Sequence, residues 1–351
     1  KIEKEKHIRP QEPIKPYPYY SEDITFENKK AGINLAGTLT LPNKEGVFPV
    51  VILISGSGPQ NRDEELLGHK PFLVLSDFLT KNGIAVLRYD DRGIAMSKGD
   101  FKTATSADFA TDVESAIAYL KTRKEINKNK IGLIGHSEGG LIAPMVASKS
   151  KDVAFIVLLA GTGIQGDSLL LLQKKLIEEA SGVSKEDIQK GQSSNRKVFD
   201  IVNQSTSLEQ LNSDLTIYFK QILKDNPNTQ KPAEMSDDDF VKLQVKQIAS
   251  PWMQYFIKYN PAPALEKVKC PVLAVNGEKD LQVPPKENLE AIKKALTKGG
   301  NKSVTTKELP NLNHLFQECK TGSPDEYATI EQTFSPNALT EILKWLQTQT
   351  K

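Results

Sequence analysis

The stretch GHSEG at residues 135–139 is the first part of the sequence whose residue types and spacing could support catalysis. It matches G-x-S-x-G, the sharp turn that raises a serine hydroxyl above the end of a parallel strand. An apolar run, Lys130 to Ile134, precedes it, and a segment rich in Ala, Leu, Met and Val, Gly139 to Ser148, follows it. This order predicts strand, turn and helix, with Ser137 as a nucleophile. The alternative is an ordinary strand-to-helix turn that happens to contain a serine.

A serine nucleophile needs a base that accepts its proton and an acid that orients the base. Asp280 follows the apolar segment Pro271 to Val275, and His314 follows the segment Ser303 to Leu309. Both segments are predicted strands, and ligands of open α/β sheets bind at the carboxyl ends of the strands. Ser137, Asp280 and His314 are therefore the candidate catalytic residues, in the chain order Ser, Asp, His.

Each of these residues also has a plainer interpretation. Asp280 could form a turn, and His314 could cap a carbonyl in its loop. Of the other three histidines, His7 lies in the N-terminal tail, His136 precedes the candidate nucleophile, and His69 lies before a predicted helix, where a structural role is expected. No two histidines stand three or four residues apart, and Cys and His do not cluster. No metal and no cofactor are therefore expected.

The elements that would position these residues alternate between strand and helix. A hairpin is predicted over residues 22–41, where two alternating runs flank a turn. The later segments read as apolar strands at 48–54, 84–89, 130–134, 153–160, 271–275 and 303–309, and as helices at 71–82, 106–121, 285–298 and 335–347. This alternation predicts an α/β fold with a parallel sheet and helices on both faces.

The alternation stops between Gly163 and Lys258, where helices are predicted to start near Asp167, Ser184, Ser207 and Ser236. We therefore expect three parts. Residues 1–20, rich in charge and then in proline, form an extended N-terminal tether. Residues 21–162 and 259–351 form the sheet domain, and residues 163–258 form a helical cap or lid inserted into it.

Composition limits the kinds of partner. The chain has 351 residues, a formal net charge of +2, 38% hydrophobic and 26% charged residues, typical of a soluble globular protein. Neither nucleic acid nor an anionic membrane is expected as a partner, and no apolar run is long enough for a membrane span. The acidic runs 63–65 and 237–239 are interpreted as solvated or helix-starting charges.

Cellular location and assembly are left open by the sequence. The chain starts at Lys1, which fits either an export signal removed upstream, and so a periplasmic or other extracytoplasmic protein, or a plain terminus of a cytoplasmic one. The cysteines Cys270 and Cys319 do not require a disulfide. No oligomeric state is predicted.

From Ile24 to Leu346 the chain resembles the α/β-hydrolase superfamily, in its esterase and serine-aminopeptidase-like branch. The motifs that carry the resemblance are ISGSGP at 54–59, RYDDRG at 88–93, GHSEGG at 135–140, VNGEKDLQVP at 275–284 and Asn313-His314. The resemblance implies an α/β-hydrolase fold, with a mostly parallel eight-stranded sheet, flanking helices and an inserted all-helical cap.

The resemblance also implies roles for individual residues. Ser137 would attack a carbonyl, His314 would act as general base and then as general acid, and Asp280 would stabilise the imidazolium. The backbone N–H groups of Ser57 and Glu138 would form the oxyanion hole.

Two motifs depart from the family pattern. Ser55-Gly56 replaces the His-Gly of many relatives, and Arg92 to Ser97 (RGIAMS) replaces Arg-Gly-x-Gly-x-Ser. Because alanine stands where the second pattern has glycine, we expect the backbone at Ala95 to avoid positive φ.

The inserted helices would select the substrate. Trp252, Tyr255, Phe256 and Tyr259 are spaced to form one aromatic face of a helix. This face could form an acyl-binding wall or a hydrophobic seam under the lid. Trp252, Tyr255 and Phe256 are the candidate substrate-binding residues.

The expected function is a cofactor-independent serine hydrolase, a carboxylesterase that cleaves short to medium acyl esters through an acyl-enzyme. A serine aminopeptidase or an acyl-CoA thioesterase is the alternative within the same fold, so the expected partner is a small-molecule ester or a peptide-like substrate. An alternative of another class is a non-catalytic protein that binds a ligand in the same pocket.

Overall fold

The computed structural model describes residues 9–226, 231–232 and 234–351. These residues form two compact units. Unit 1 contains the described residues up to Phe101 together with Ala107–Ile164 and Pro261–Lys351. Unit 2 contains Lys102–Ser106 and the described residues of Gln165–Asn260. The part of the predicted tether at residues 1–8, and residues 227–230 and 233 of the predicted cap, lie outside the described residues.

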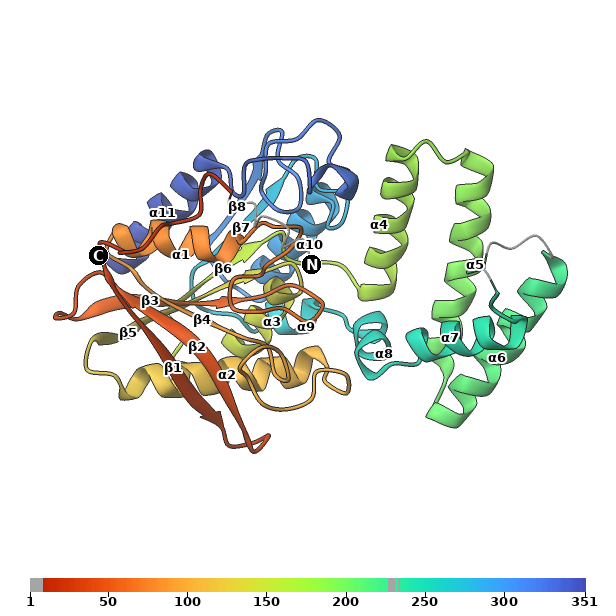
Figure 1. Ribbon diagram of the computed structural model, residues 1–351, viewed down its shortest axis with the longest axis horizontal. Helices are drawn as coiled ribbons and strands as arrows, with labels where there is room; N and C mark the ends of the chain where they lie inside the picture. The colour runs from red at the N-terminus through yellow and green to blue at the C-terminus, as the bar shows by residue number, and fades with distance from the viewer. Residues whose placement is uncertain (1–8, 227–230, 233) are drawn as a thin grey trace, which may run out of the picture. The chain divides into compact units, whose positions relative to one another are not determined.

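Unit 1 is built on one eight-stranded sheet with the strand order β1-β2-β4-β3-β5-β6-β7-β8 (Figure 1). From β4 to β8 all neighbouring strands pair in parallel, while β2 pairs antiparallel with both β1 and β4. The strands are β1 (Tyr20–Asn28), β2 (Ile33–Leu41), β3 (Phe48–Ile54), β4 (Ala85–Tyr89), β5 (Ile126–His136), β6 (Phe155–Leu159), β7 (Val272–Gly277) and β8 (Val304–Leu309). The prediction of a mostly parallel sheet with an antiparallel hairpin at its edge is confirmed.

Helices cover the sheet because its central strands are apolar on both faces. All five residues of β4 and of β6 are buried. The helices of this unit are α1 (Pro71–Lys81), α2 (Ser106–Thr122), α3 (Glu138–Ala147), α9 (Ala262–Leu265), α10 (Pro285–Lys298) and α11 (Pro336–Thr350), with a short 3-10 helix η1 (Pro324–Glu326). One core cluster joins α1 and α11 to β3, β4, β6 and β7, and Figure 1 shows both helices on the same side of the sheet, with α2 on the other.

Among its described residues, the regular secondary structure of unit 2 consists of helices joined by short turns and loops. Its helices are α4 (Gly166–Ala180), α5 (Lys185–Gln204), α6 (Leu208–Asp225), α7 (Asp237–Ile248) and α8 (Pro251–Lys258). Serine side chains cap α5, α6, α7 and α8, as their position before each helix predicts. Val202, Leu215 and Ile257 are fully buried in its core. That this unit acts as a lid stays a prediction.

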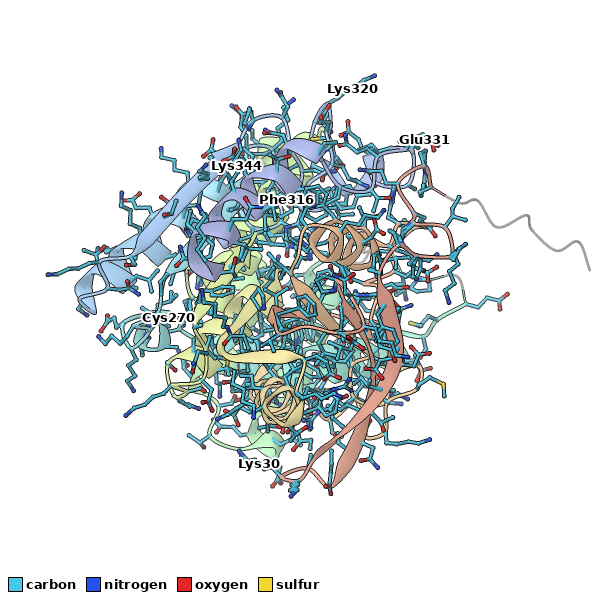
Figure 2. All side chains as sticks on the ribbon, turned by 90° about the vertical axis from the view of Figure 1, so that its left-hand side faces the viewer. Lys30, Cys270, Phe316, Lys320, Glu331 and Lys344 are labelled. Carbon is cyan, nitrogen blue, oxygen red and sulfur yellow. The ribbon has the colours of Figure 1, made fainter. Side chains whose placement is uncertain are left out.

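The N-terminal segment from Arg9 to Glu12 is fixed to unit 1. The Gln11 amide donates to the oxygen of Phe334 at 2.7 Å and accepts from the N–H groups of Thr333 at 2.6 Å and Phe334 at 3.0 Å. Arg9 donates to backbone oxygens of the segment 328–330, and it pairs with Glu331, which is labelled in Figure 2. From Arg9 onward the expected tether is therefore an integral part of this unit.

The backbone at Ala95 contradicts the expectation from the sequence, because its φ is 45°. The following residues fix this conformation. Ser97 donates from Oγ to the backbone oxygen of Asp90 at 2.7 Å and accepts from Ala36 N–H at 2.9 Å, and Met96 N–H donates to the Asp90 carboxylate. These bonds offset the cost, about 1 to 2 kcal/mol, of a left-handed alanine.

Hydropathy gives one further result. Across the described ranges, none of the helices combines the length and apolar character that crossing a membrane requires.

Candidate active site

Ser137 lies at the junction between β5, which ends at His136, and α3, which begins at Glu138. Its backbone has φ 53° and ψ −114°, a region that non-glycine residues rarely adopt. Ser137 N–H donates to the oxygen of Leu159 at 2.9 Å, and Gly140 N–H donates to the oxygen of Ser137 at 2.9 Å. The surrounding backbone therefore holds the serine in the strained turn that a nucleophile elbow requires.

The two glycines of the motif are required by close approaches of backbone. A Cβ atom on Gly135 would lie 2.0 Å from the oxygen of Gly139, and one on Gly139 would lie 2.0 Å from the oxygen of Ile54. Neither neighbour is a side chain that could move away. The glycines thus allow α3 to start directly above the ends of β3 and β5.

Asp280 and His314 are in contact, although the two residues follow different strands. Nδ1 of His314 lies 2.8 Å from Oδ2 of Asp280, and both residues are at least 96% buried. The other oxygen of Asp280 accepts the N–H groups of Gln282 and Val283, each at 2.8 Å. Asp280 is thereby fixed in place, and its contact through Nδ1 leaves Nε2 as the ring nitrogen that could act on a serine.

The loop that carries His314 is held by its neighbour. Oδ1 of Asn313 accepts the N–H groups of Leu315 at 3.0 Å and Gln317 at 2.9 Å. In the same loop, the buried ring of Phe316, which Figure 2 labels, stacks on Phe334 with the centroids 5.4 Å apart. Hydrogen bonds and ring packing therefore both hold the loop of His314.

Ser137 and His314 line the same cavity, which has a volume of about 80 Å³. Its lining residues are Gly56, Ser57, Gln60, Glu64, Leu66, His136, Ser137, Gln282, His314 and Leu315. The structure thus brings together three of the residues predicted from the sequence, Ser137, His314 and Ser57, with Asp280 directly behind His314.

The predicted oxyanion donors, Ser57 and Glu138, both belong to segments next to the nucleophile. Glu138 is the first residue of α3, where helical N–H groups and the helix dipole favour negative charge. Ser57 lies in the loop after β3, next to Gly56, where a Cβ atom would come within 3.2 Å of the Cβ of Ser137. This arrangement is suited to holding a negative oxygen, and the roles of both N–H groups stay predictions.

Two buried acidic side chains, those of Glu64 and Asp91, anchor the loop after β3. Gly56 N–H donates to Oε1 of Glu64 at 2.7 Å. Asp91 accepts from the hydroxyl of Ser55 at 2.8 Å and from Gln60 N–H at 3.0 Å. Burial raises the pKa of Asp91 to about 8, against the lowering effect of these two hydrogen bonds.

Glu64 and Asp91 belong to the site but were not predicted from the sequence. Glu64 belongs to the run 63–65 that was interpreted as solvated, but only 4% of its surface is exposed. No local pattern marks it, because its partner His136 is 72 residues away. Asp91 lies inside the motif RYDDRG, so the motif contained a signal for it.

The aromatic residues near the end of unit 2 form two stacked pairs. Trp252 stacks on Phe256 with centroids 5.0 Å apart, and Tyr255 stacks on Tyr259 at 5.5 Å. The prediction that Tyr259 extends this helical face is wrong. Helix α8 ends at Lys258, and Tyr259 has an extended backbone. Phe256 is buried, and its ring lies against Gly166. A substrate-binding role for Trp252, Tyr255 and Phe256 stays a prediction.

Comparisons with known proteins agree with this architecture. Esterase EstD of Thermotoga maritima is 26% identical over 334 residues, which cover 94% of this chain and 69% of EstD. The crystal structure of the alpha/beta hydrolase GrgF from Penicillium sp. sh18 matches with a TM-score of 0.58 and 16% identity, over 94% of this chain and 99% of GrgF. The Pyrococcus furiosus esterase Pf2001 matches with a TM-score of 0.54 and 15% identity, over 95% and 94% of the two chains.

These matches confirm the α/β-hydrolase fold, and a family comparison is more specific. The model of the family described as X-Pro dipeptidyl-peptidase (S15 family) matches residues 31–307, well over half of the chain. The protein is therefore a hydrolase of the α/β-hydrolase fold, and it belongs to the X-Pro dipeptidyl-peptidase (S15) family.

Proposed function

We propose that the protein is a serine carboxylesterase that cleaves short to medium acyl esters through an acyl-enzyme. The observation that carries the proposal is the cavity shared by Ser137 and His314, with Asp280 2.8 Å behind the imidazole. The esterase EstD, which aligns with 94% of the chain, gives independent support.

The reaction begins with attack of the Ser137 hydroxyl oxygen on the ester carbonyl carbon. Nε2 of His314 takes the hydroxyl proton, and the Asp280 carboxylate stabilises the resulting imidazolium. The carbonyl oxygen becomes negative and accepts hydrogen bonds from the N–H groups of Ser57 and Glu138. The carbon–oxygen bond to the alcohol then breaks, and the alcohol leaves with the proton from His314.

Hydrolysis of the acyl-enzyme repeats these steps with water. His314 removes a proton from water as the water oxygen attacks the acyl carbon. The tetrahedral intermediate expels Ser137, which regains its proton from His314. The products are one carboxylic acid and one alcohol, and the enzyme returns to its starting state.

The cavity favours a small and uncharged acyl group. At about 80 Å³ it is far smaller than the roughly 300–1,000 Å³ of sites for drug-sized ligands. Among the described residues that line it, Glu64 is the one carboxylate, and its Oε1 already accepts from Gly56 and contacts His136. A charged peptide amino terminus has no spare carboxylate in this lining.

The family match supports a second candidate function, release of Xaa-Pro dipeptides from the amino terminus of peptides. The same Ser137, His314 and Asp280 would perform this acyl transfer, with an amine in place of the alcohol as leaving group. The selection of proline would then depend on residues outside the small cavity.

One experiment separates the two candidates. Purified protein and Ser137→Ala are assayed with p-nitrophenyl esters of increasing acyl length and with Xaa-Pro p-nitroanilides. We expect the protein to hydrolyse the short esters, and the variant to lose this activity with an unchanged circular dichroism spectrum. Hydrolysis of the anilides alone would transfer the assignment to the peptidase, and equal ester hydrolysis by the variant would refute the proposed nucleophile.

A further inference from the structure

His136, the residue before the nucleophile, contacts an acceptor at each ring nitrogen. Nδ1 lies 2.9 Å from Oε1 of Glu64, and Nε2 lies 2.9 Å from the backbone oxygen of His314. Only 6% of the surface of His136 and 4% of that of Glu64 is exposed. Both contacts therefore form away from bulk water, where an unsatisfied polar atom is costly.

These two contacts determine how many protons the pair must hold. A backbone oxygen can only accept, so Nε2 of His136 carries a hydrogen. The 2.9 Å contact between Nδ1 and Oε1 needs a second hydrogen. Oε1 already accepts a hydrogen bond from the N–H of Gly56 at 2.7 Å. We therefore assign Oε1 as the acceptor in its contact with His136 as well, and the second hydrogen to Nδ1. His136 is then an imidazolium paired with a carboxylate.

We propose that the His136–Glu64 ion pair positions the reacting groups, by linking the nucleophile turn, the backbone of His314 and the loop after β3 through one buried proton. This inference rests on the proposed function. His136 and Glu64 are positioning residues, since neither takes part in bond making. All three connections exist together when Nδ1 of His136 carries its proton.

The three connections involve the proposed nucleophile, the proposed general base and one proposed oxyanion donor. His136 is the chain neighbour of Ser137 and ends β5. Its Nε2 holds the backbone of the residue that supplies the general base. Glu64 holds Gly56, the residue before the proposed oxyanion donor Ser57.

The proton also sets the charge beside the reaction. With the proton in place the pair is neutral overall, but without it a net negative charge would remain next to the oxyanion that forms during attack. Like charges at short range in a buried site disfavour each other strongly. Loss of the proton would therefore slow the reaction even if the fold were unchanged.

The charged surroundings agree with this assignment. Burial alone would lower the pKa of His136, but the Glu64 carboxylate, hydrogen bonds to Glu64 and to the His314 oxygen, and the charge of Asp280 together raise it. The ring of His314, another titratable group, also faces it, with the centroids 4.8 Å apart, and Asp91 and Glu138 interact electrostatically with each other, and Asp91 also with Glu64. Because the pKa is raised, the protonated form of His136 is fully present below about pH 6.5, the ordinary value, and is lost as the pH rises through the raised value.

His69 provides a matched comparison within the same chain. It is also buried, and its Nε2 also faces a backbone oxygen, that of Tyr327, at 2.9 Å. Its Nδ1 instead faces the hydroxyl of Thr333 at 3.0 Å, which can donate. His69 can therefore satisfy both contacts while neutral, and burial lowers its pKa.

The first test reads the proton directly and needs no substrate. Nitrogen NMR of protein labelled with 15N-histidine is recorded across pH, with signals assigned through His136→Gln and His69→Gln. At pH 7 we expect both ring nitrogens of His136 to be protonated, and one ring nitrogen of His69 to be unprotonated. An unprotonated Nδ1 of His136 at pH 7 would overturn the proposal.

The second test uses Glu64→Gln, which keeps the size of the side chain and an oxygen for Gly56 but removes the charge. We expect kcat for ester hydrolysis to fall about 10- to 100-fold with little change in KM, as for a small misplacement of reacting groups. We also expect kcat of the wild type to fall at alkaline pH, as His136 loses its proton, and this fall to be absent in Glu64→Gln. His69→Gln should keep the wild-type pH profile.

These tests can fail independently of the proposed esterase function. Unchanged kcat and pH profile in Glu64→Gln would overturn the positioning role while leaving the esterase assignment intact. Absence of any hydrolysis in the wild type would refute the function, and the NMR measurement would still decide the proton state.

Discussion

Oδ2 of Asp280 lies 2.8 Å from Nδ1 of His314, and both residues are almost fully buried. The contact joins the loop after β7 to the loop after β8, 34 residues apart in the chain. Because Nδ1 donates to this carboxylate, the neutral imidazole has its lone pair on Nε2. That is the tautomer in which the ring could accept a proton from Ser137.

We predict that Asp280→Asn lowers kcat for ester hydrolysis on the order of 10⁴-fold, the effect of the same change in other Ser-His-Asp sites. An amide nitrogen at Oδ2 would donate to Nδ1 and move the imidazole proton to Nε2. Folding should persist, because Oδ1 can still accept from Gln282 and Val283. Steady-state kinetics beside the surface variant Asp152→Asn would check this, and a loss of less than tenfold would count against the role of Asp280.

A second prediction concerns the dependence of stability on pH. Burial raises the pKa of Asp91 to about 8, above the roughly 3.9 of an unfolded aspartate, so the folded state binds one more proton between these values. The contribution of Asp91 to stability is therefore present below about pH 4 and is lost as the pH rises towards 8. Asp91→Asn mimics the protonated acid in shape and hydrogen bonding to Ser55 and Gln60.

The variant should therefore lose less stability than the wild type on going from pH 5 to pH 9. We expect a difference in melting temperature of several degrees between the two pH responses, since 1 kcal/mol corresponds to roughly 2 to 4 °C in a large domain. Thermal unfolding followed by circular dichroism gives the measurement. Parallel pH responses would mean that Asp91 is ionised in the folded protein.

The nucleophile turn should not tolerate a methyl group. In Gly139→Ala the new Cβ would lie 2.0 Å from the backbone oxygen of Ile54, so we expect destabilisation of about 3 kcal/mol together with loss of activity. Gly191→Ala is the control, because its Cβ would meet nothing closer than 3.8 Å within helix α5. That change should stabilise by about 0.5 to 1 kcal/mol. Urea unfolding of both variants tests the contrast, and equal midpoints would contradict it.

The N-terminal segment should contribute measurably to stability. Gln11→Ala removes the acceptor of two backbone N–H groups, those of the buried residues Thr333 and Phe334. We expect a loss of about 1 to 3 kcal/mol, because the two donors would be left unsatisfied. Gln347→Ala, on the exposed side of α11, should have no effect in the same unfolding experiment. If the two variants behave alike, the segment is only loosely attached.

The sheet and the capped helices could be predicted because their signals are local. Continuous apolar runs such as Phe48 to Ile54 are typical of strands buried on both faces, and serines such as Ser184 and Ser236 stand directly before their helices. Ser137, Asp280 and His314 could be predicted as candidates because each lies in a turn or loop that directly follows an apolar strand. The sequence did not show that Ser137 and His314 line one cavity with Asp280 against the imidazole, because this depends on the register of the whole sheet.

Other features could not be predicted, because distant residues determine them. Glu64 looks like a surface acid in the sequence, and it is buried by contacts with Gly56 and with His136. Ala95 adopts a positive φ in a turn that Ser97 fixes by accepting the N–H of Ala36, 61 residues away, and this contact outweighs the local preference of alanine. Contacts between residues that are 60 or more positions apart produce no periodic pattern in the sequence.

In the proposed mechanism, Ser137 forms the covalent intermediate. The most direct measurement is incubation with a p-nitrophenyl alkylphosphonate, followed by peptide mass spectrometry of the modified protein. We expect one phosphonyl group per chain, located on Ser137, with loss of activity in proportion to labelling. Labelling of another residue, or full activity in protein whose Ser137 is completely labelled, would show that Ser137 is not the nucleophile.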